Sequence, residues 1–338
     1  MKKILSIVVM IIVLFAALYF SMIKTNAAEE NRVVIYTAAE DERIAYMQEA
    51  MNQEFPNIEV VFQSLGTGEL LSKLQAEAFS TSCDIFYDLE VVNAEIVLNA
   101  NPGLFADLSE YDFSIYDPSV IGYTSRHHNY APNGKTYGAF LVNTRALEEE
   151  GLSVPAAYDD MLDPQYEWMI SMPSPKSSGT GYSLYNGIIS MRGEEEGLKY
   201  FEQLDQNIME YTTSGSAPVK SVDRNDAAIG FGLLWQCVQY ANANEDLSVV
   251  IPDNALPFDL FTMGMIAGHE TNENVKAVFD YLYNDLNKTQ VAKFNPDRIY
   301  TDQLPAEIEN YPEGFEEINM VNLYDFTYKQ ELLDKWSY

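Results

Sequence analysis

Apolar and polar residues change their period several times in the first part of the chain. A compact apolar run at 33–36 has the length of a buried strand, and residues 41–55 then carry apolar side chains at helical spacing. A strand at 58–62, a second amphipathic helix from about Glu69 and a strand at 84–87 follow. This order predicts right-handed βαβ units and a mostly parallel sheet.

The rest of the chain repeats the alternation with different lengths. The predicted strands are at 137–142, 168–172, 227–233, 247–251 and 260–267, and the predicted helices are at 182–191 and 275–286. The two halves show no sequence repeat of fixed period and no linker rich in Gly and Ser. We therefore expect two α/β lobes joined by short crossing strands, with hinge closure around a ligand as the natural motion.

The predicted division of the chain has four parts. Residues 1–28 are a signal peptide or anchor, 29–140 form lobe 1, 141–256 form lobe 2, and 257–338 return to lobe 1 and add C-terminal helices. Ligands of open α/β sheets bind at the carboxyl ends of the strands. The expected fold class is therefore α/β, with a ligand cleft between two lobes.

Residues 1–28 have the pattern of an export signal. Lys2 and Lys3 precede an uncharged, mostly apolar run at 4–23, and small residues follow at 25–28. The apolar run is longer than a typical signal core, so an uncleaved membrane anchor is the alternative. We expect the mature protein to act in the periplasm or on the extracellular face of the cytoplasmic membrane.

Composition narrows the class of partner. The 338 residues include 51 Asp and Glu but only 20 Lys and Arg, for a formal net charge of −31. Such a charge repels nucleic acid, so no nucleic-acid partner is expected. Two cysteines, Cys83 and Cys237, are too few for a disulfide scaffold or a four-cysteine metal site. We expect a monomer without cofactor or bound metal.

The loops that precede helices carry most of the candidate chemistry. Residues 177–181 place three hydroxyl side chains and two glycines between a strand and a helix. Glycine allows close backbone approach, and the amides and dipole of a helix N-terminus favour an anion. Ordinary helix capping is the alternative, because Ser and Thr are preferred N-caps. Loops 64–68 and 212–218 have similar composition, and we hypothesise that all three converge on one tetrahedral oxyanion.

Polar residues near strand ends complete the candidate ligand contacts. Thr37 and Glu40 follow the first strand, Asp88 follows the third, and Asp259 lies at the start of the last apolar run. Asp88 or Asp259 could bind a ligand ammonium. Because the chain has 51 acidic residues, plain solvation at the surface is the alternative for each carboxylate.

Catalytic signals are mostly missing. The chain has no Gly-x-Ser-x-Gly elbow, no Ser-x-x-Lys and no His-Glu-x-x-His. His127 and His128 are adjacent, a spacing that rarely allows two histidines to bind one metal. An exported α/β protein with anion loops and no catalytic set indicates binding, so we expect no catalytic residue.

Several segments resemble a known family over nearly all of the mature chain. They are 34–40, 66–74, 83–86, 162–166, 172–181, 211–218 and 227–230. In them the chain resembles an extracellular solute-binding protein of an ABC importer, from the group of ferric-iron, polyamine and phosphonate binders. Segments 211–218 and 227–230 are similar to the 2-aminoethylphosphonate-binding branch and its phosphorylated-sugar-binding relatives.

The resemblance implies a two-lobed Venus-flytrap fold of the type II periplasmic-binding-protein class and an ABC permease as partner. It also implies a small anionic solute, favoured as 2-aminoethylphosphonate or another organophosphonate or phosphate ester. The family's anion-binding positions fall on Thr67, Ser178, Gly179, Thr180, Ser214 and Ser216.

Three alternatives stay open. Ferric binders use adjacent tyrosines late in the second lobe, and the matching stretch at 233–240 has no such pair, although Tyr240 and other tyrosines leave iron open. An exported phosphate-ester hydrolase is the enzyme alternative. A signalling receptor with the same fold is the third.

Overall fold

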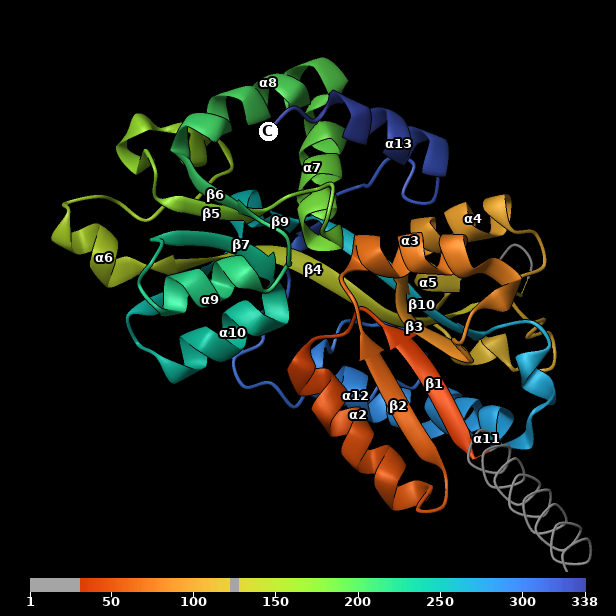
Figure 1. The fold of residues 1–338 in the computed structure, drawn as a ribbon. Coiled ribbons are helices and arrows are strands. Elements are labelled where there is room, and N and C mark those ends of the chain that lie inside the picture. The colour runs from red at the N-terminus through yellow and green to blue at the C-terminus, as the bar shows by residue number, and fades with distance from the viewer. Residues whose placement is uncertain (1–30, 122–127) are drawn as a thin grey trace, which may run out of the picture.

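The computed structural model describes residues 31–121 and 128–338 (Figure 1). The expected signal or anchor at 1–28 lies outside the described residues, and so does His127. Within the described part, one sheet of nine strands has the order β2-β1-β3-β10-β4-β7-β5-β6, and β8 pairs with β4. The two ends of this sheet belong to different lobes, so the predicted two-lobed α/β fold is confirmed.

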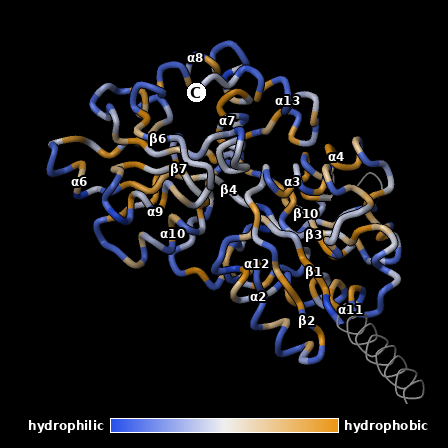
Figure 2. The backbone as a smooth tube through the Cα atoms, viewed as in Figure 1, coloured by the Kyte–Doolittle hydropathy of each residue, from blue (hydrophilic) through white to orange (hydrophobic). Residues whose placement is uncertain are grey.

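The first lobe has a parallel sheet with helices on both faces (Figure 1). Its elements are β1 (Arg32–Thr37), α2 (Asp41–Glu54), β2 (Glu59–Ser64), α3 (Thr67–Glu77), β3 (Ile85–Glu90), α4 (Val91–Ala100) and α5 (Pro118–Ile121). Figure 2 shows hydrophobic residues along β1 and β2, which pair directly. The predicted strands and helices of this region are confirmed to within a few residues.

The second lobe repeats the plan around β5, which pairs in parallel with β6 and β7. Its elements are α6 (Thr144–Glu149), β5 (Ile170–Pro173), α7 (Gly179–Arg192), α8 (Glu194–Leu204), β6 (Ile208–Thr212), α9 (Ala217–Asp223), β7 (Ile229–Leu233), α10 (Leu234–Ala243) and β8 (Leu247–Val250). The start of α7 differs from the prediction at 182, because Ser178 caps the helix and accepts a hydrogen bond from the Gly181 amide at 3.4 Å.

Two antiparallel strands join the lobes. In β4 (Ala131–Asn143), residues 131–137 pair with β10 (Phe258–Met265). Residues 138–143 of the same strand pair with β7 and β8. The predicted boundary at 140/141 therefore falls within a continuous strand. The polar residues at 132–136 concealed the first half of β4 from a hydrophobicity pattern, yet all of this strand is buried.

The C-terminal part packs against both lobes. Its elements are β9 (Ala255–Leu256), α11 (Glu273–Tyr281), a π-helical turn at Leu282–Leu286, α12 (Asn287–Phe294), β11 (Glu316–Glu317) and α13 (Phe326–Lys335). The β10 strand returns to the first lobe and pairs with β3, as expected. However, α13 lies beside both α4 and α7 (Figure 1). No helix in the described ranges is long and apolar enough to cross a membrane.

Asp297 provides a test of the packing behind the crossing strands. This side chain is 7% exposed, and the Tyr311 hydroxyl lies 3.0 Å from both of its carboxylate oxygens. Burial raises the Asp297 pKa from 3.8 to about 8. Between these values the native state keeps a proton that the unfolded chain releases, so this group makes stability fall as pH rises.

We expect Asp297→Asn to flatten the decline in unfolding free energy between pH 4 and 8. The lost slope approaches about 1.4 kcal/mol per pH unit, and urea unfolding at several pH values measures it. Asp285→Asn, at an exposed carboxylate, is the control. Identical pH profiles for Asp297→Asn and the wild type would contradict the assignment.

Candidate functional site

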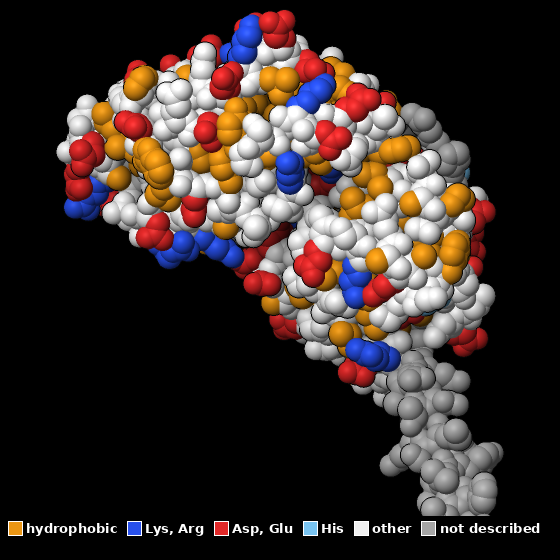
Figure 3. All heavy atoms as spheres, turned by 45° about the horizontal axis from the view of Figure 1, so that its top comes forward, with side chains coloured by type: hydrophobic (Ala, Val, Ile, Leu, Met, Phe, Trp, Pro, Cys, Tyr) orange, Lys and Arg blue, Asp and Glu red, His pale blue; other side chains and the backbone are white. Residues whose placement is uncertain are grey.

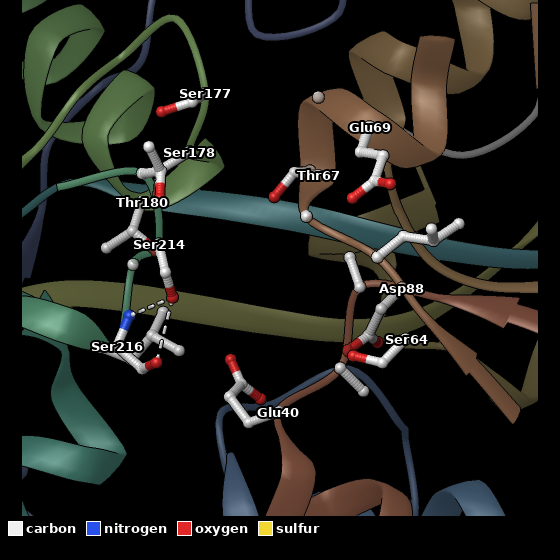
Figure 4. A pocket seen from close by; sticks show the side chains of 18 of the residues that line it. Glu40, Ser64, Thr67, Glu69, Asp88, Ser177, Ser178, Thr180, Ser214 and Ser216 are labelled. Carbon is white, nitrogen blue, oxygen red and sulfur yellow. Dashed lines mark hydrogen bonds between the residues drawn. The ribbon is translucent and has the colours of Figure 1, made fainter. Parts of the chain in front are cut away.

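A polar cavity of about 840 Å³ lies between the lobes. Lobe 1 contributes the loops that follow β1 and β2 together with Asp88 of β3, and lobe 2 contributes the starts of α7 and α9 (Figure 4). Ten of the described lining residues carry a hydroxyl: Ser64, Thr67, Ser72, Thr136, Ser177, Ser178, Thr180, Thr213, Ser214 and Ser216. The cavity is therefore rich in neutral hydrogen-bond donors.

The lobe-2 wall consists of two loops in direct contact. Ser178 caps α7 and Thr180 lies in its first turn, while Ser214 and Ser216 belong to the loop before α9. The hydroxyls of Ser214 and Ser216 are 3.1 Å apart. A Cβ at Gly215 would overlap the Thr180 side chain, so glycine allows the loops to meet. Figure 4 shows these four hydroxyl residues along one wall.

Two lysines add positive charge near these hydroxyls. Lys176 precedes α7 and Lys220 lies in α9, and both line the cavity. Neither has an ion-pair partner within the described part of the chain. The lobe-2 wall thus combines amides, hydroxyls and two cations, a donor set suited to an oxyanion.

The lobe-1 wall is organised by a buried arginine. The Arg43 guanidinium donates two hydrogen bonds to Asp88, at 2.5 and 3.1 Å, and one to Glu40 at 3.2 Å. Gln290 accepts a further bond from its Nε, and Asn133 donates to Asp88. Asp88 has φ of 59°, a left-handed conformation that aspartate tolerates better than most residues.

One guanidinium therefore serves two carboxylates. Burial would lower the Arg43 pKa, but Asp88 and Glu40 raise it overall, so the arginine stays charged. Burial raises the Glu40 pKa, and Arg43 opposes this shift. With both acids ionised, the group carries one net negative charge, and Figure 4 shows the Glu40 carboxylate directed into the cavity.

The lobes also touch at the rim of the cavity. A Cβ at Gly68, in the first turn of α3, would lie 3.6 Å from the Lys176 carbonyl oxygen and 3.7 Å from that of Ser177. The backbones of the two walls therefore meet at this point. A ligand between the walls would be enclosed on this side.

Seven of the ten predicted ligand residues line this cavity: Glu40, Thr67, Asp88, Ser178, Thr180, Ser214 and Ser216. Three do not. Thr37 is fully buried and accepts a hydrogen bond from the Ala39 amide. Gly179 lies against Glu90, whose Oε1 occupies the space of a Cβ. Asp259 is 3% exposed on β10, outside the lining.

Sequence reasoning did not single out Arg43, Lys176 or Lys220. Lys176 lay within a highlighted loop, so its proximity to the hydroxyls was a usable signal. Arg43 had no local signal, because its partner Asp88 is 45 residues away. Within the described ranges, no cluster of three or more His, Cys, Asp and Glu could hold a metal ion.

A two-lobed α/β fold with a polar interlobe cavity is typical of solute-binding proteins. The sequence profile described as "Bacterial extracellular solute-binding protein" matches residues 86–322. The chain belongs to this family. Proteins of this type bind small solutes and deliver them to an ABC permease, and the family implies export.

Individual proteins share the sequence or the fold of this chain. A Haemophilus influenzae protein described as uncharacterized is 23% identical over 325 residues, which cover 92% of this chain and 91% of the relative. The periplasmic binding protein AfuA from Actinobacillus pleuropneumoniae, solved with fructose-6-phosphate bound, has a TM-score of 0.78 and 21% identity, with coverage of 90% and 97%. The periplasmic binding protein P5PA has a TM-score of 0.77 and 20% identity, with coverage of 90% and 98%.

Removal of the buried cation tests the lobe-1 wall. Arg43→Met leaves Glu40 and Asp88 without their shared partner, so we expect the unfolding free energy to fall by about 3–5 kcal/mol. Urea unfolding measures the change. Arg145→Met, at an exposed ion pair with Glu149, should change it by less than about 1 kcal/mol. Equal small losses for the two variants would show that Arg43 does not organise this wall.

Proposed function

We propose that this solute-binding protein captures an organophosphonate or a small phosphate ester between its lobes and passes it to an ABC permease. The observation that carries this proposal is the convergence of hydroxyls from two helix starts, represented by Thr180 and Ser214, on one side of the cavity. Amides at a helix start and the hydroxyls beside them are donors suited to a tetrahedral oxyanion.

The net charge of the protein does not oppose this function. Figure 3 shows acidic side chains over both lobes, but their fields are screened over about 8 Å at physiological ionic strength. Inside the cavity, the nearest groups on lobe 2 are neutral donors together with Lys176 and Lys220. Local donors therefore outweigh the distant surface charge.

One structural neighbour holds a phosphate-bearing ligand. AfuA was solved with fructose-6-phosphate, and this chain has the same fold over 90% of its length. At 21% sequence identity, the likeness shows a shared fold and does not show a shared ligand. The hydroxyl-rich wall of this chain is the independent support for a phosphorus oxyanion.

The opposite wall favours a ligand that also carries an amine. With both carboxylates ionised, the Glu40, Asp88 and Arg43 group has one net negative charge, and Asp88 already accepts bonds from Arg43 and Asn133. Asp259 lies outside the lining, so Glu40 is the better placed partner for an ammonium. We therefore favour 2-aminoethylphosphonate, whose two ends match the two walls.

Iron and hydrolysis receive less support. None of the described lining residues is a tyrosine or a histidine, so this cavity offers no tyrosinate ligand for iron and no histidine base for a hydroxyl nucleophile. The ferric-iron binder and the phosphate-ester hydrolase thus remain alternatives without a positive observation in this cavity.

The ligand class is tested by calorimetric titration against 2-aminoethylphosphonate, inorganic phosphate, glucose 6-phosphate, spermidine and ferric citrate. We expect 2-aminoethylphosphonate to bind most tightly. Thr180→Ala should weaken its binding by about tenfold or more, since a hydrogen bond to a charged group is lost. Ser109→Ala, on an exposed turn, is the matched control. Binding of ferric citrate alone would contradict the proposal.

Glu40→Gln tests the amine end separately. We expect it to weaken 2-aminoethylphosphonate binding by about tenfold, because the ammonium loses its ionised partner and keeps only a neutral amide oxygen, and to leave inorganic phosphate binding unchanged or slightly tighter. The same titrations measure both ligands. An equal loss for the two ligands would show that Glu40 does not contact the amine.

A further inference from the structure

A buried carboxylate lies behind the turn that forms the lobe-2 wall. Glu90 is the last residue of β3 and is fully buried. Its Oε1 has no hydrogen-bond partner in the described part of the chain and occupies the space of a Cβ at Gly179, the first residue of α7. Gly179 therefore admits a lobe-1 carboxylate to the N-terminal turn of a lobe-2 helix.

The C-terminal helix supplies a cation to this carboxylate. Lys329 on α13 is 6% exposed, and its Nζ donates to Glu90 Oε2 at 2.6 Å and to Asn93 Oδ1 at 3.1 Å. The same Nζ lies 4.5 Å from the centroid of the Tyr182 ring, which belongs to α7. Lys329 is thus held between α4 and α7.

The body of α13 is fixed to lobe 2. The Tyr185 hydroxyl of α7 donates to the Leu332 carbonyl at 3.1 Å. Trp336, directly after α13, packs edge-on against Tyr185 and Phe201 with centroids 5.0 and 5.5 Å apart. These contacts hold Lys329 in place from the lobe that carries the hydroxyl wall.

Other charged groups surround the same turn. Asp259 on β10 interacts with both Glu90 and Lys329, and burial raises its pKa well above the ordinary value. On the other side of the turn, the charged residues that line the cavity are Lys176, Lys220, Arg43, Glu40, Asp41, Glu69 and Asp88. Without Lys329, the groups behind the turn would therefore be acidic only.

This arrangement has an electrostatic consequence for the cavity. A carboxylate at a helix N-terminus is stabilised by the helix dipole, and its negative charge repels a second anion at the same turn. Screening is weak for a fully buried charge. An oxyanion at Ser178 and Thr180 would consequently feel the Glu90 charge unless a nearby cation cancels it.

We propose that Lys329 is the counter-charge of the anion-binding turn: it neutralises Glu90 behind α7 and so makes the Ser178–Thr180 turn able to accept an anion. Lys329 is a positioning residue that acts through Glu90 and does not touch the ligand. The role of the turn as an anion site rests on the proposed function, whereas the effect of Lys329 on its potential is measurable without any ligand.

The test uses a thiolate as a resident anion. Thr180→Cys places a thiol in the first turn of α7, and its pKa follows from the rate of iodoacetamide alkylation against pH. Cys83 and Cys237 are fully buried and should not react in the folded protein. We expect Lys329→Met in this background to raise the thiol pKa by at least about half a unit.

Removal of the Glu90 charge distinguishes an electrostatic effect of Lys329→Met from a structural one. Adding Glu90→Gln to the Thr180→Cys, Lys329→Met protein should lower the thiol pKa again, because both buried charges are then gone. Lys335→Met is the matched control, since its partner Glu194 is on the surface, and it should leave the thiol pKa unchanged. An unchanged pKa with Lys329→Met, or no reversal by Glu90→Gln, overturns the proposal.

Two further measurements test the proposal if the first variant does not fold or if no anion binds. If Lys329→Met prevents folding, Glu90→Gln alone in the Thr180→Cys protein must lower the thiol pKa, and a failure to do so overturns the proposal. With Thr180 intact, inorganic phosphate and 2-aminoethylphosphonate should bind the Lys329→Met protein about tenfold more weakly. If the wild type binds neither anion, the proposed function fails, while the thiol pKa still decides the role of Lys329.

Discussion

The continuous pairing of β4 with β10 and then with β7 and β8 is the constraint on which the site depends. One strand belongs to the sheets of both lobes, so the ladder fixes where the lobe-1 and lobe-2 walls stand relative to each other. The loops that follow β1 and β2, together with Asp88 of β3, then face the starts of α7 and α9 across one cavity. Strands that cross between two lobes in this way are typical of hinges, so we expect the lobes to rotate about β4 and β10.

The two walls differ in their chemistry. Lobe 2 presents hydroxyls, helix amides and lysines, whereas lobe 1 presents carboxylates that share Arg43. A cavity with opposite preferences at its two walls selects ligands by the distance and sign of their charges. This asymmetry would allow a protein with a formal net charge of −31 to hold the anion that we propose.

Much of this arrangement could be predicted from local sequence rules. Amphipathic spacing located α2 and α3, and the cluster of Ser, Thr and Gly at 177–181 located a helix start with donors, because capping is a property of adjacent residues. Contacts between residues far apart in the sequence could not be predicted in this way. Arg43 is buried by a bond to Asp88, and Gly179 is required by Glu90 from the other lobe. The polar first half of β4 is satisfied by tertiary partners, among them Asp88 for Asn133.

The central claim is that a phosphorus oxyanion binds to the lobe-2 wall with the rest of the ligand directed to lobe 1. A crystal structure of the protein with 2-aminoethylphosphonate tests this most directly. We expect the phosphonate oxygens within hydrogen-bond distance of Thr180 and Ser214 and the amine beside Glu40. A phosphonate at the carboxylate wall, or outside the interlobe cavity, would contradict the account.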